Sequence, residues 1–295
     1  MNLILLAAQS SPDLATLFPQ RHTALLPVAG SPLLGHALDL LAEATPARWL
    51  VTVGEHAAEM TSWLAARPWT SEPRVIALGE PAGLLSALSR SRDYLPGNEP
   101  LLIVPAGGVL KADWSRLDNS AVALVDGEVA CALFVPRAEW LWTAVNGLMT
   151  QPAAPTLGDL ARALQKGGTP VATQAVIQWE DASTPAGLLR ANKRLLSVGY
   201  GSREALERSF AEGFTVLPPI FLADTAEVSS AVLGPYVSVG EGAVIEDAIL
   251  RNSIIAPGAR VSGCVLDGAI VGRNSQITGR LHELRAGDNS QISLG

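Results

Sequence analysis

The chain contains few cysteines, no long apolar run and no basic cluster, and each absence excludes a class of protein. Only 2 of its 295 residues are cysteine, and Cys131 and Cys264 lie far apart in apolar segments. We therefore expect buried free thiols rather than a disulfide framework or a metal cluster. No apolar run approaches the ~18 residues of a membrane-spanning helix, and the N-terminus has no basic signal region. We expect a soluble cytoplasmic protein.

Charge also limits the partners of this chain. The 21 Lys and Arg residues are scattered, and the net charge is −7 with a pI of about 5.2. Phosphate-rich surfaces need clustered cations, so we expect neither nucleic acid nor an anionic membrane as a partner. The hydrophobic content of 48% is ample for a packed core, and the length fits one large or two ordinary domains.

Strand and helix patterns alternate in the first two thirds of the chain. Residues 3–8 predict a buried first strand, and Ser31 is a candidate N-cap with Pro32 at the first position of the next helix. This alternation predicts a parallel sheet with right-handed crossovers and a ligand loop after the first strand. Further predicted strands are 49–53, 74–78 and 101–104, and predicted helices are 33–44, 55–65, 81–90 and 203–214.

Residues 2–34 carry a long motif, NLILLAAQSSPDLATLFPQRHTALLPVAGSPLL. It resembles the sugar-1-phosphate nucleotidylyltransferase signature L-A-A-G-x-G-T-R-L-x-P-L-T-x-x-x-P-K-x-L-L-P-V-x-G-x-P-L. The resemblance implies a Rossmann-like α/β domain of the GT-A type. The residues on scaffold positions are Leu6, Ala7, Ala8, Leu14, Leu17, Leu25, Leu26, Pro27, Val28, Gly30, Pro32 and Leu33.

The chemical positions of the same motif differ. Gln9 and Ser11 stand where the family has glycines, Asp13 where it has the arginine, and Thr23 where it has the lysine. In the family, the glycine loop admits a nucleoside triphosphate and the two cations neutralise its phosphates. Here the loop is crowded, Pro12 removes an N–H donor, and an anion replaces a cation. The sequence therefore predicts a pocket that repels a triphosphate.

Three later segments resemble other family landmarks. Residues 80–88, EPAGLLSAL, match a base-contacting segment that keeps Gly83, and residues 101–110, LLIVPAGGVL, match a strand that ends in N-G-D. Gly107 fits that motif, but Gly108 replaces the aspartate that holds magnesium in the family. Residues 179–196, WEDASTPAGLLRANKRLL, keep the second metal position as Asp181. The alternative role for Asp181 is to cap the helix that follows.

A deletion separates these landmarks. The chain runs from ALVDGEV almost directly to ACALFVP, with Ala130, Cys131 and Ala132 at the positions of the family's N-A-G strand. Asp126 and Gly127 between two apolar alternating runs predict a β-hairpin. This hairpin replaces the excursion that carries the sugar-phosphate motif in the family.

The last 80 or so residues show a repeat of about 16 residues. Aliphatic residues recur in steps of six, six and four, which predicts a left-handed parallel β-helix of about four coils over 217–292, weakened at Gly287 and Ser293 like a cap. We predict a nucleotidyltransferase-like domain at 1–199, a linker helix at 200–216 and the β-helix at 217–295. The proposed ladder is Leu233, Val239, Ile245, Ile249, Ile255, Val261, Val265, Val271 and Ile277, continued by Leu281.

Three functions follow from these patterns. The first is an active nucleotidylyltransferase, which would need Mg²⁺, and the second is a hexapeptide acyltransferase with His282 as its base. The third, which we favour, is a noncatalytic binding, regulatory or assembly subunit, as the resemblance suggests for the alpha subunit of eukaryotic GDP-mannose pyrophosphorylase. We expect no cofactor, and we expect the chain to assemble with itself or with another chain through the β-helix. We also expect a relict pocket for a nucleotide sugar, in which Asp181 is the one candidate metal ligand. The expected pocket residues are Ala7, Ala8, Gln9, Ser11, Gly83, Gly107 and Asp181.

Overall fold

The computed structural model describes residues 1–279 apart from 8–11, 70–71, 79–82, 96 and 150–153. The chain divides into two compact units, Met1–Val198 and Gly199–Gly295, called unit 1 and unit 2 below. In the part of the chain that the structure describes, no helix is both long and apolar enough to cross a membrane.

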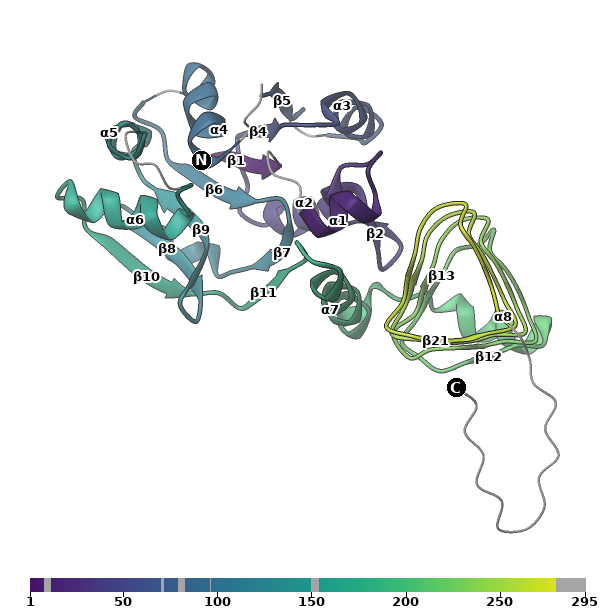
Figure 1. The fold of residues 1–295 in the computed structure, drawn as a ribbon. Coiled ribbons are helices and arrows are strands. Elements are labelled where there is room, and N and C mark those ends of the chain that lie inside the picture. Colours follow the sequence, from purple (N-terminus) through teal and green to yellow (C-terminus); the bar gives the residue numbers. More distant parts are fainter. Residues whose placement is uncertain (8–11, 70–71, 79–82, 96, 150–153, 280–295) are drawn as a thin grey trace, which may run out of the picture. The chain divides into compact units, whose positions relative to one another are not determined.

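Unit 1 is built on a seven-stranded sheet (Figure 1). The predicted parallel core is confirmed, since β1 pairs in parallel with both of its neighbours, while β9 runs antiparallel to the strands on either side. The order is β10 (Val171–Ala175), β8 (Ala121–Asp126), β9 (Val129–Val135), β6 (Leu101–Pro105), β1 (Asn2–Ala7), β4 (Arg48–Val53) and β5 (Arg74–Ala77).

Helices cover both faces of this sheet. Alternate residues of β1 divide between two cores: Leu3 and Leu5 pack with α2 (Leu33–Ala42) and α3 (Ala57–Ala65), whereas Ile4 packs with α4, α5 and α6. This arrangement follows from the period-two alternation of a strand that is buried on both sides. The other helices are α1 (Pro12–Leu17), α4 (Leu84–Ser91), α5 (Ala138–Leu148), α6 (Leu157–Lys166) and α7 (Pro185–Leu195).

The predicted N-cap of α2 is wrong, although the helix begins at Leu33 as the predicted range 33–44 has it. Ser31 and Pro32 form the short strand β3, which pairs antiparallel with β2 (Pro27–Val28). Pro32 is therefore the N-cap, in an extended conformation and without a side-chain cap bond, and α2 begins at Leu33. The sequence contains the turn signal of this small hairpin in Gly30, whose φ of 86° suits glycine.

The predicted hairpin at Asp126 and Gly127 is confirmed. Asp126 of β8 pairs with Val129 of β9, which leaves Gly127 and Glu128 as the two loop residues. Gly127 has a φ of 59°, as a tight two-residue turn requires. The hairpin forces β9 to run antiparallel inside a sheet whose core is parallel.

Unit 2 fits a left-handed β-helix of hexapeptide repeats. Helix α8 (Glu204–Glu212) precedes it and buries Ala205 against its first coil, where Arg208 donates hydrogen bonds to the carbonyls of Ala223 and Ala226. Four coils stack as three parallel sheets. These are β12 (Thr215–Val216), β15 (Val232–Leu233), β18 (Ile249–Arg251) and β21 (Val265–Asp267); β13 (Phe221–Leu222), β16 (Ser238–Val239), β19 (Ile254–Ile255) and β22 (Ile270–Val271); and β14 (Glu227–Ser229), β17 (Val244–Glu246), β20 (Arg260–Ser262) and β23 (Gln276–Thr278).

The structure corrects the predicted aliphatic ladder at two positions. Leu250 and Leu266, not Ile249 and Val265, continue the inner row below Leu233. Leu250 is fully buried, whereas Ile249 is 42% exposed and Val265 is 68% exposed. The step that closes a coil, from Ile245 to Leu250 and from Val261 to Leu266, is five residues rather than four. Leu250 and Leu266 therefore each lie one residue after the position that we predicted. Leu281, His282, Gly287 and Ser293 lie outside the described residues.

A matched pair of substitutions tests this register. Leu250→Ala should lower the free energy of unfolding by about 2–5 kcal/mol because it leaves a cavity in the β-helix core. Ile249→Ala should cost less than about 1 kcal/mol because the side chain is largely exposed. Chemical denaturation measures both, and equal or reversed costs would contradict the register.

Candidate active site

The carboxyl ends of β1 and β6 lie side by side in the centre of the sheet. Leu6 pairs with Pro105, and the N–H of Ala106 donates to the carbonyl of Leu6 at 2.9 Å. In an open α/β sheet, ligands bind outside these strand ends. The loop that follows β1 and the strand that follows β6 are therefore the elements expected to form a site.

A two-stranded ribbon brings together the two metal positions predicted by resemblance. Strand β7 (Gly108–Lys111) pairs antiparallel with β11 (Gln178–Asp181), and Gly108 lies directly opposite Asp181. The N–H of Ala182 donates to the carbonyl of Gly107 at 2.9 Å, which fixes this end of the ribbon. Of the two paired positions, only Asp181 has a side chain that can bind a cation.

The space above Gly108 is filled. A Cβ atom at this position would lie 2.5 Å from Cη2 of Trp179 and 2.8 Å from the carbonyl oxygen of Glu180. Real Cβ contacts are longer than 3.0 Å, so no side chain fits here unless β11 moves. By contrast, a Cβ at the neighbouring Gly107 would meet no atom within 4 Å.

A cleft of about 720 Å³ opens beside this ribbon in unit 1. It collects residues from β1, α1, β6, the β8–β9 hairpin, the start of α6 and the end of β11. Its described lining is Leu6, Pro12, Asp13, Leu84, Pro105, Gly107, Val129, Ala130, Pro155, Thr156, Leu157, Trp179, Asp181, Ser183 and Thr184.

The structure brings together some of the predicted site residues. Asp13, Gly107 and Asp181 line the cleft, as does Ala130 at the first N-A-G position. The described lining does not include Ala7, Thr23, Gly83 or Gly108. Ala8, Gln9 and Ser11 lie outside the described residues.

The charge of the cleft is unfavourable for phosphate. Among the described residues that line it, none is Lys, Arg or His, while Asp13 and Asp181 are both acidic. The sequence segments 8–11 and 79–82, which lie outside the described residues, contain no Lys or Arg either. A polyanionic ligand would therefore meet carboxylates without a compensating cation.

The donor set does not fit a catalytic magnesium ion. Hard divalent cations take several oxygen ligands, with carboxylates most favoured. Within the described ranges, no three His, Cys, Asp or Glu side chains are placed to hold a metal ion. Asp181 already accepts a hydrogen bond at Oδ1 from the N–H of Ser183, at 2.9 Å. One exposed carboxylate beside a side-chain-free glycine is a poor magnesium site.

Buried hydrogen bonds fix the segment that carries the lysine position. The N–H of Ala24 donates to Nδ1 of His22, so Nε2–H donates to the carbonyl of Ala7 at 2.7 Å. Burial lowers the pKa of His22 below its usual value, although the bond to Ala7 opposes this, and the ring is neutral at pH 7. Thr23 is buried at the start of a 3₁₀ turn. The position at which the resemblance expects a lysine is therefore a buried, uncharged turn.

The cation nearest in sequence to this segment is already paired. Arg21 donates from Nε to Glu59 at 2.8 Å, and the N–H of His22 donates to the same carboxylate at 3.0 Å. Burial opposes ionisation of Glu59, but these donors outweigh it and lower its pKa. Arg21 therefore anchors residues 21–22 to α3.

The alternative role that we predicted for Asp181 is wrong. Thr184 caps α7, since its hydroxyl accepts from the N–H of Gly187 at 3.0 Å, and Pro185 stands at the first helical position. Asn192, in the same motif as Asp181, also has a structural role. Asn192 is buried and accepts from the N–H of Ala29 at 2.9 Å, which holds the turn before α2.

The thiols do not add chemistry to the cleft. Cys131 is buried and free as predicted, and burial raises its pKa to about 11, so it is protonated at neutral pH. The prediction is wrong in part for Cys264, which is free but only half-buried. Burial also raises the pKa of Cys264.

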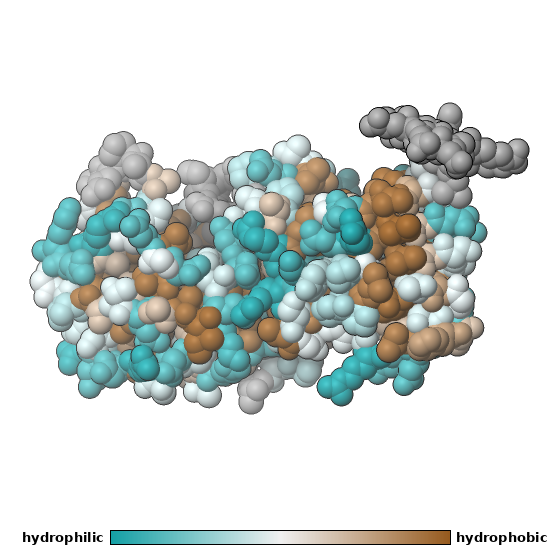
Figure 2. Space-filling model, turned by 90° about the horizontal axis from the view of Figure 1, so that it is seen from below, coloured by the Kyte–Doolittle hydropathy of each residue, from teal (hydrophilic) through white to brown (hydrophobic). Residues whose placement is uncertain are grey.

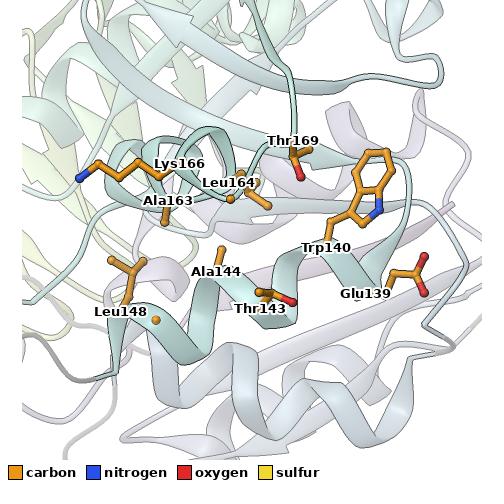
Figure 3. A pocket seen from close by; sticks show the side chains of 11 residues that line it. Glu139, Trp140, Thr143, Ala144, Leu148, Ala163, Leu164, Lys166 and Thr169 are labelled. Carbon is orange, nitrogen blue, oxygen red and sulfur yellow. The ribbon is translucent and has the colours of Figure 1, made fainter.

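A second cavity, of about 580 Å³, lies between α5 and α6 (Figure 3). Its lining includes Trp140, with Glu139 and Lys166 at opposite ends. It contains none of the residues that the sequence singled out. The cleft beside Gly107 is therefore the better candidate site.

Sequence reasoning missed the packing of Trp179 over Gly108. Trp179 was visible only as the first letter of a family motif, and its packing over Gly108 depends on the pairing of β7 with β11. Thr156 was missed as well; it lines the cleft and forms a capping box with Asp159, whose pKa falls to about 2 because the backbone N–H and hydroxyl of Thr156 donate to it.

Paired glycine substitutions test the filled site. Gly108→Ala should lower the free energy of unfolding by about 1–3 kcal/mol because the added methyl meets Trp179. The matched control Gly107→Ala should have little effect, and Trp179→Leu should reduce the cost of Gly108→Ala. Denaturation of these three variants and of the Gly108→Ala/Trp179→Leu double variant measures this coupling. If the costs of Gly108→Ala and Trp179→Leu simply add in the double variant, the contact is contradicted.

Known proteins resemble this chain in sequence and in fold. No family model matches the chain. Bifunctional protein GlmU from Cupriavidus necator is 26% identical over 329 residues, covering 92% of this chain and 70% of that protein. Glucose-1-phosphate thymidylyltransferase from Streptomyces antibioticus is 24% identical over 143 residues, 39% of this chain and 38% of that protein.

A solved structure shares the fold. A crystal structure from Bacillus anthracis, described as a glucose-1-phosphate thymidylyltransferase in complex with a sucrose, matches with a TM-score of 0.55 and 17% identity, over 68% of this chain and 98% of that one. The match shows the fold, and the sequence relatives carry names of the same kind. The chain is therefore related to the sugar-1-phosphate nucleotidylyltransferases.

Proposed function

We propose that this chain is a noncatalytic member of its family that acts as a binding, regulatory or assembly subunit. The observation that carries the proposal is the filled space over Gly108. A nucleotidyl transfer needs a metal ion and fixed cations where phosphate charge develops. At Gly108 an aspartate would collide with Trp179 and the carbonyl of Glu180.

The remaining groups support the same conclusion. Asp13 and Asp181 give the cleft two negative charges, and Thr23 lies buried where the family has its lysine. A triphosphate would lose its hydration without gaining a cationic partner in exchange. The cleft itself is open and partly apolar, so a ligand with little negative charge is compatible with it, including a relict sugar ligand.

We further propose that the contribution of the chain is assembly through its β-helix. A short solenoid presents flat strand faces to its surroundings, and these suit docking against another subunit. The described coils of unit 2 retain a continuous inner ladder, whereas the chemical positions of unit 1 have changed. The homo- or hetero-oligomeric state of the chain is part of this proposal.

The first test is turnover. With each common NTP, a panel of sugar 1-phosphates and Mg²⁺, pyrophosphate release should be at least about 100-fold slower than for a family enzyme with complete motifs, because several charge contacts are lost. A turnover of ~1 per second or above that Asp181→Asn abolishes would contradict the proposal. Sensitivity to Asp181→Asn separates true turnover from a contaminating enzyme.

The second test is triphosphate binding. A ligand at ~100 times its dissociation constant adds about 2.7 kcal/mol of stability, which thermal unfolding detects easily. Millimolar NTP with Mg²⁺ should give little stabilisation, because the cleft carries two carboxylates.

The control for this binding test is a matched charge change. Asp13→Arg should increase stabilisation by NTP, whereas Asp93→Arg, the same charge change at an exposed position outside the cleft lining, should not. Strong stabilisation of the unmodified protein that Asp13→Arg fails to increase would contradict the charge argument.

A further inference from the structure

The corrected register of the β-helix leaves an aliphatic row on its outer surface. Val232 pairs with Ile249, and Ile249 pairs with Val265, on the outer side of the sheet β12-β15-β18-β21. The alternating partners Leu233 and Leu250 point inward and are fully buried. Figure 2, which views the lower side of Figure 1, shows a column of hydrophobic surface across the stacked coils.

The fold does not require aliphatic residues at these outer positions. On the sheet β14-β17-β20-β23, the corresponding outer residues include Glu227, Arg260 and Gln276, and only Val244 is aliphatic. The same coil geometry is therefore satisfied by polar residues. Exposed aliphatic residues stacked on successive coils mark a surface that another protein covers.

A charged row runs beside the aliphatic row on the same sheet. Arg251 follows Ile249 by two residues and Asp267 follows Val265 by two, so both point outward, and they pair with each other at 2.9 Å. More than half of each of these two side chains is exposed. The coil of β18 thus carries a positive charge beside Ile249, and the coil of β21 carries a negative charge beside Val265.

This arrangement is self-complementary. A two-fold axis along the strands, between β18 and β21, places the coil of β18 against the coil of β21 of a second copy. Ile249 then meets Val265 of the second copy, and Arg251 meets Asp267 of the second copy. A closed two-fold contact needs such a surface, in which each residue finds its complement in the other copy.

We propose that this outer face of β18 and β21 is the surface through which two copies of the chain associate, with their β-helices antiparallel. The inference rests on the assembly role proposed above and specifies its partner and face. Two coils form a small contact, so the dimer is weak and dissociates in the micromolar range.

The test uses the full-length protein in sedimentation equilibrium over a wide concentration range. Val265→Asp should weaken association at least about tenfold, because it places two unpaired charges in the contact. The matched control Val244→Asp, an outer residue of the polar sheet, should leave association unchanged. Near-UV circular dichroism checks that both variants are folded.

Charge exchange tests the geometry. Arg251→Asp and Asp267→Arg should each dimerise poorly alone, since like charges then face each other. An equal mixture of the two variants should dimerise, because the two aspartates of one variant then face the two arginines of the other across the contact.

The outcomes separate this inference from the proposed function. A protein that is monomeric at every concentration overturns the dimer and the self-assembly part of the proposal, while the noncatalytic part is judged by turnover. An oligomer that is insensitive to Val265→Asp, or a mixture that fails to associate, overturns this face alone and leaves assembly standing.

Discussion

The pairing of β7 with β11 determines what unit 1 can do. This pairing places Gly108 opposite Asp181, and in the same register it lays the indole of Trp179 over Gly108. In this structure a side chain at Gly108 would displace the indole that covers it. An aspartate introduced at Gly108 would therefore cost stability unless the indole and β11 moved.

The rest of the cleft is consistent with this constraint. Residues 21–22 are held to the end of β1 by the neutral ring of His22 and to α3 by the Arg21–Glu59 pair, and neither of these directs a cation into the cleft. The scaffold contacts have structural roles: Thr184 caps α7, and Asn192 holds the turn before α2. Two of the motif residues that remain in this chain, Thr184 and Asn192, thus serve the fold.

Sequence reasoning predicted the framework well because periodicity and turn chemistry are local. The first strand and the hairpin at Gly127 followed from patterns within a few residues, and the β-helix followed from a short repeat. It failed where a one-residue shift in strand register, or a contact between segments distant in sequence, determined where a side chain lies. Ile249 and Leu250 are both aliphatic, so the pattern alone did not show which one points inward. Likewise, the position of Trp179 depends on a strand pairing about 70 residues away in sequence, which no local pattern reveals.

The central claim is that the cleft does not hold a metal–nucleotide complex, and Mn²⁺ tests it most directly. Electron paramagnetic resonance detects Mn²⁺ with each NTP in the presence and absence of the protein. We expect the same Mn²⁺–nucleotide spectrum in both samples. A protein-bound Mn²⁺ signal that depends on nucleotide and disappears in Asp181→Asn would contradict it.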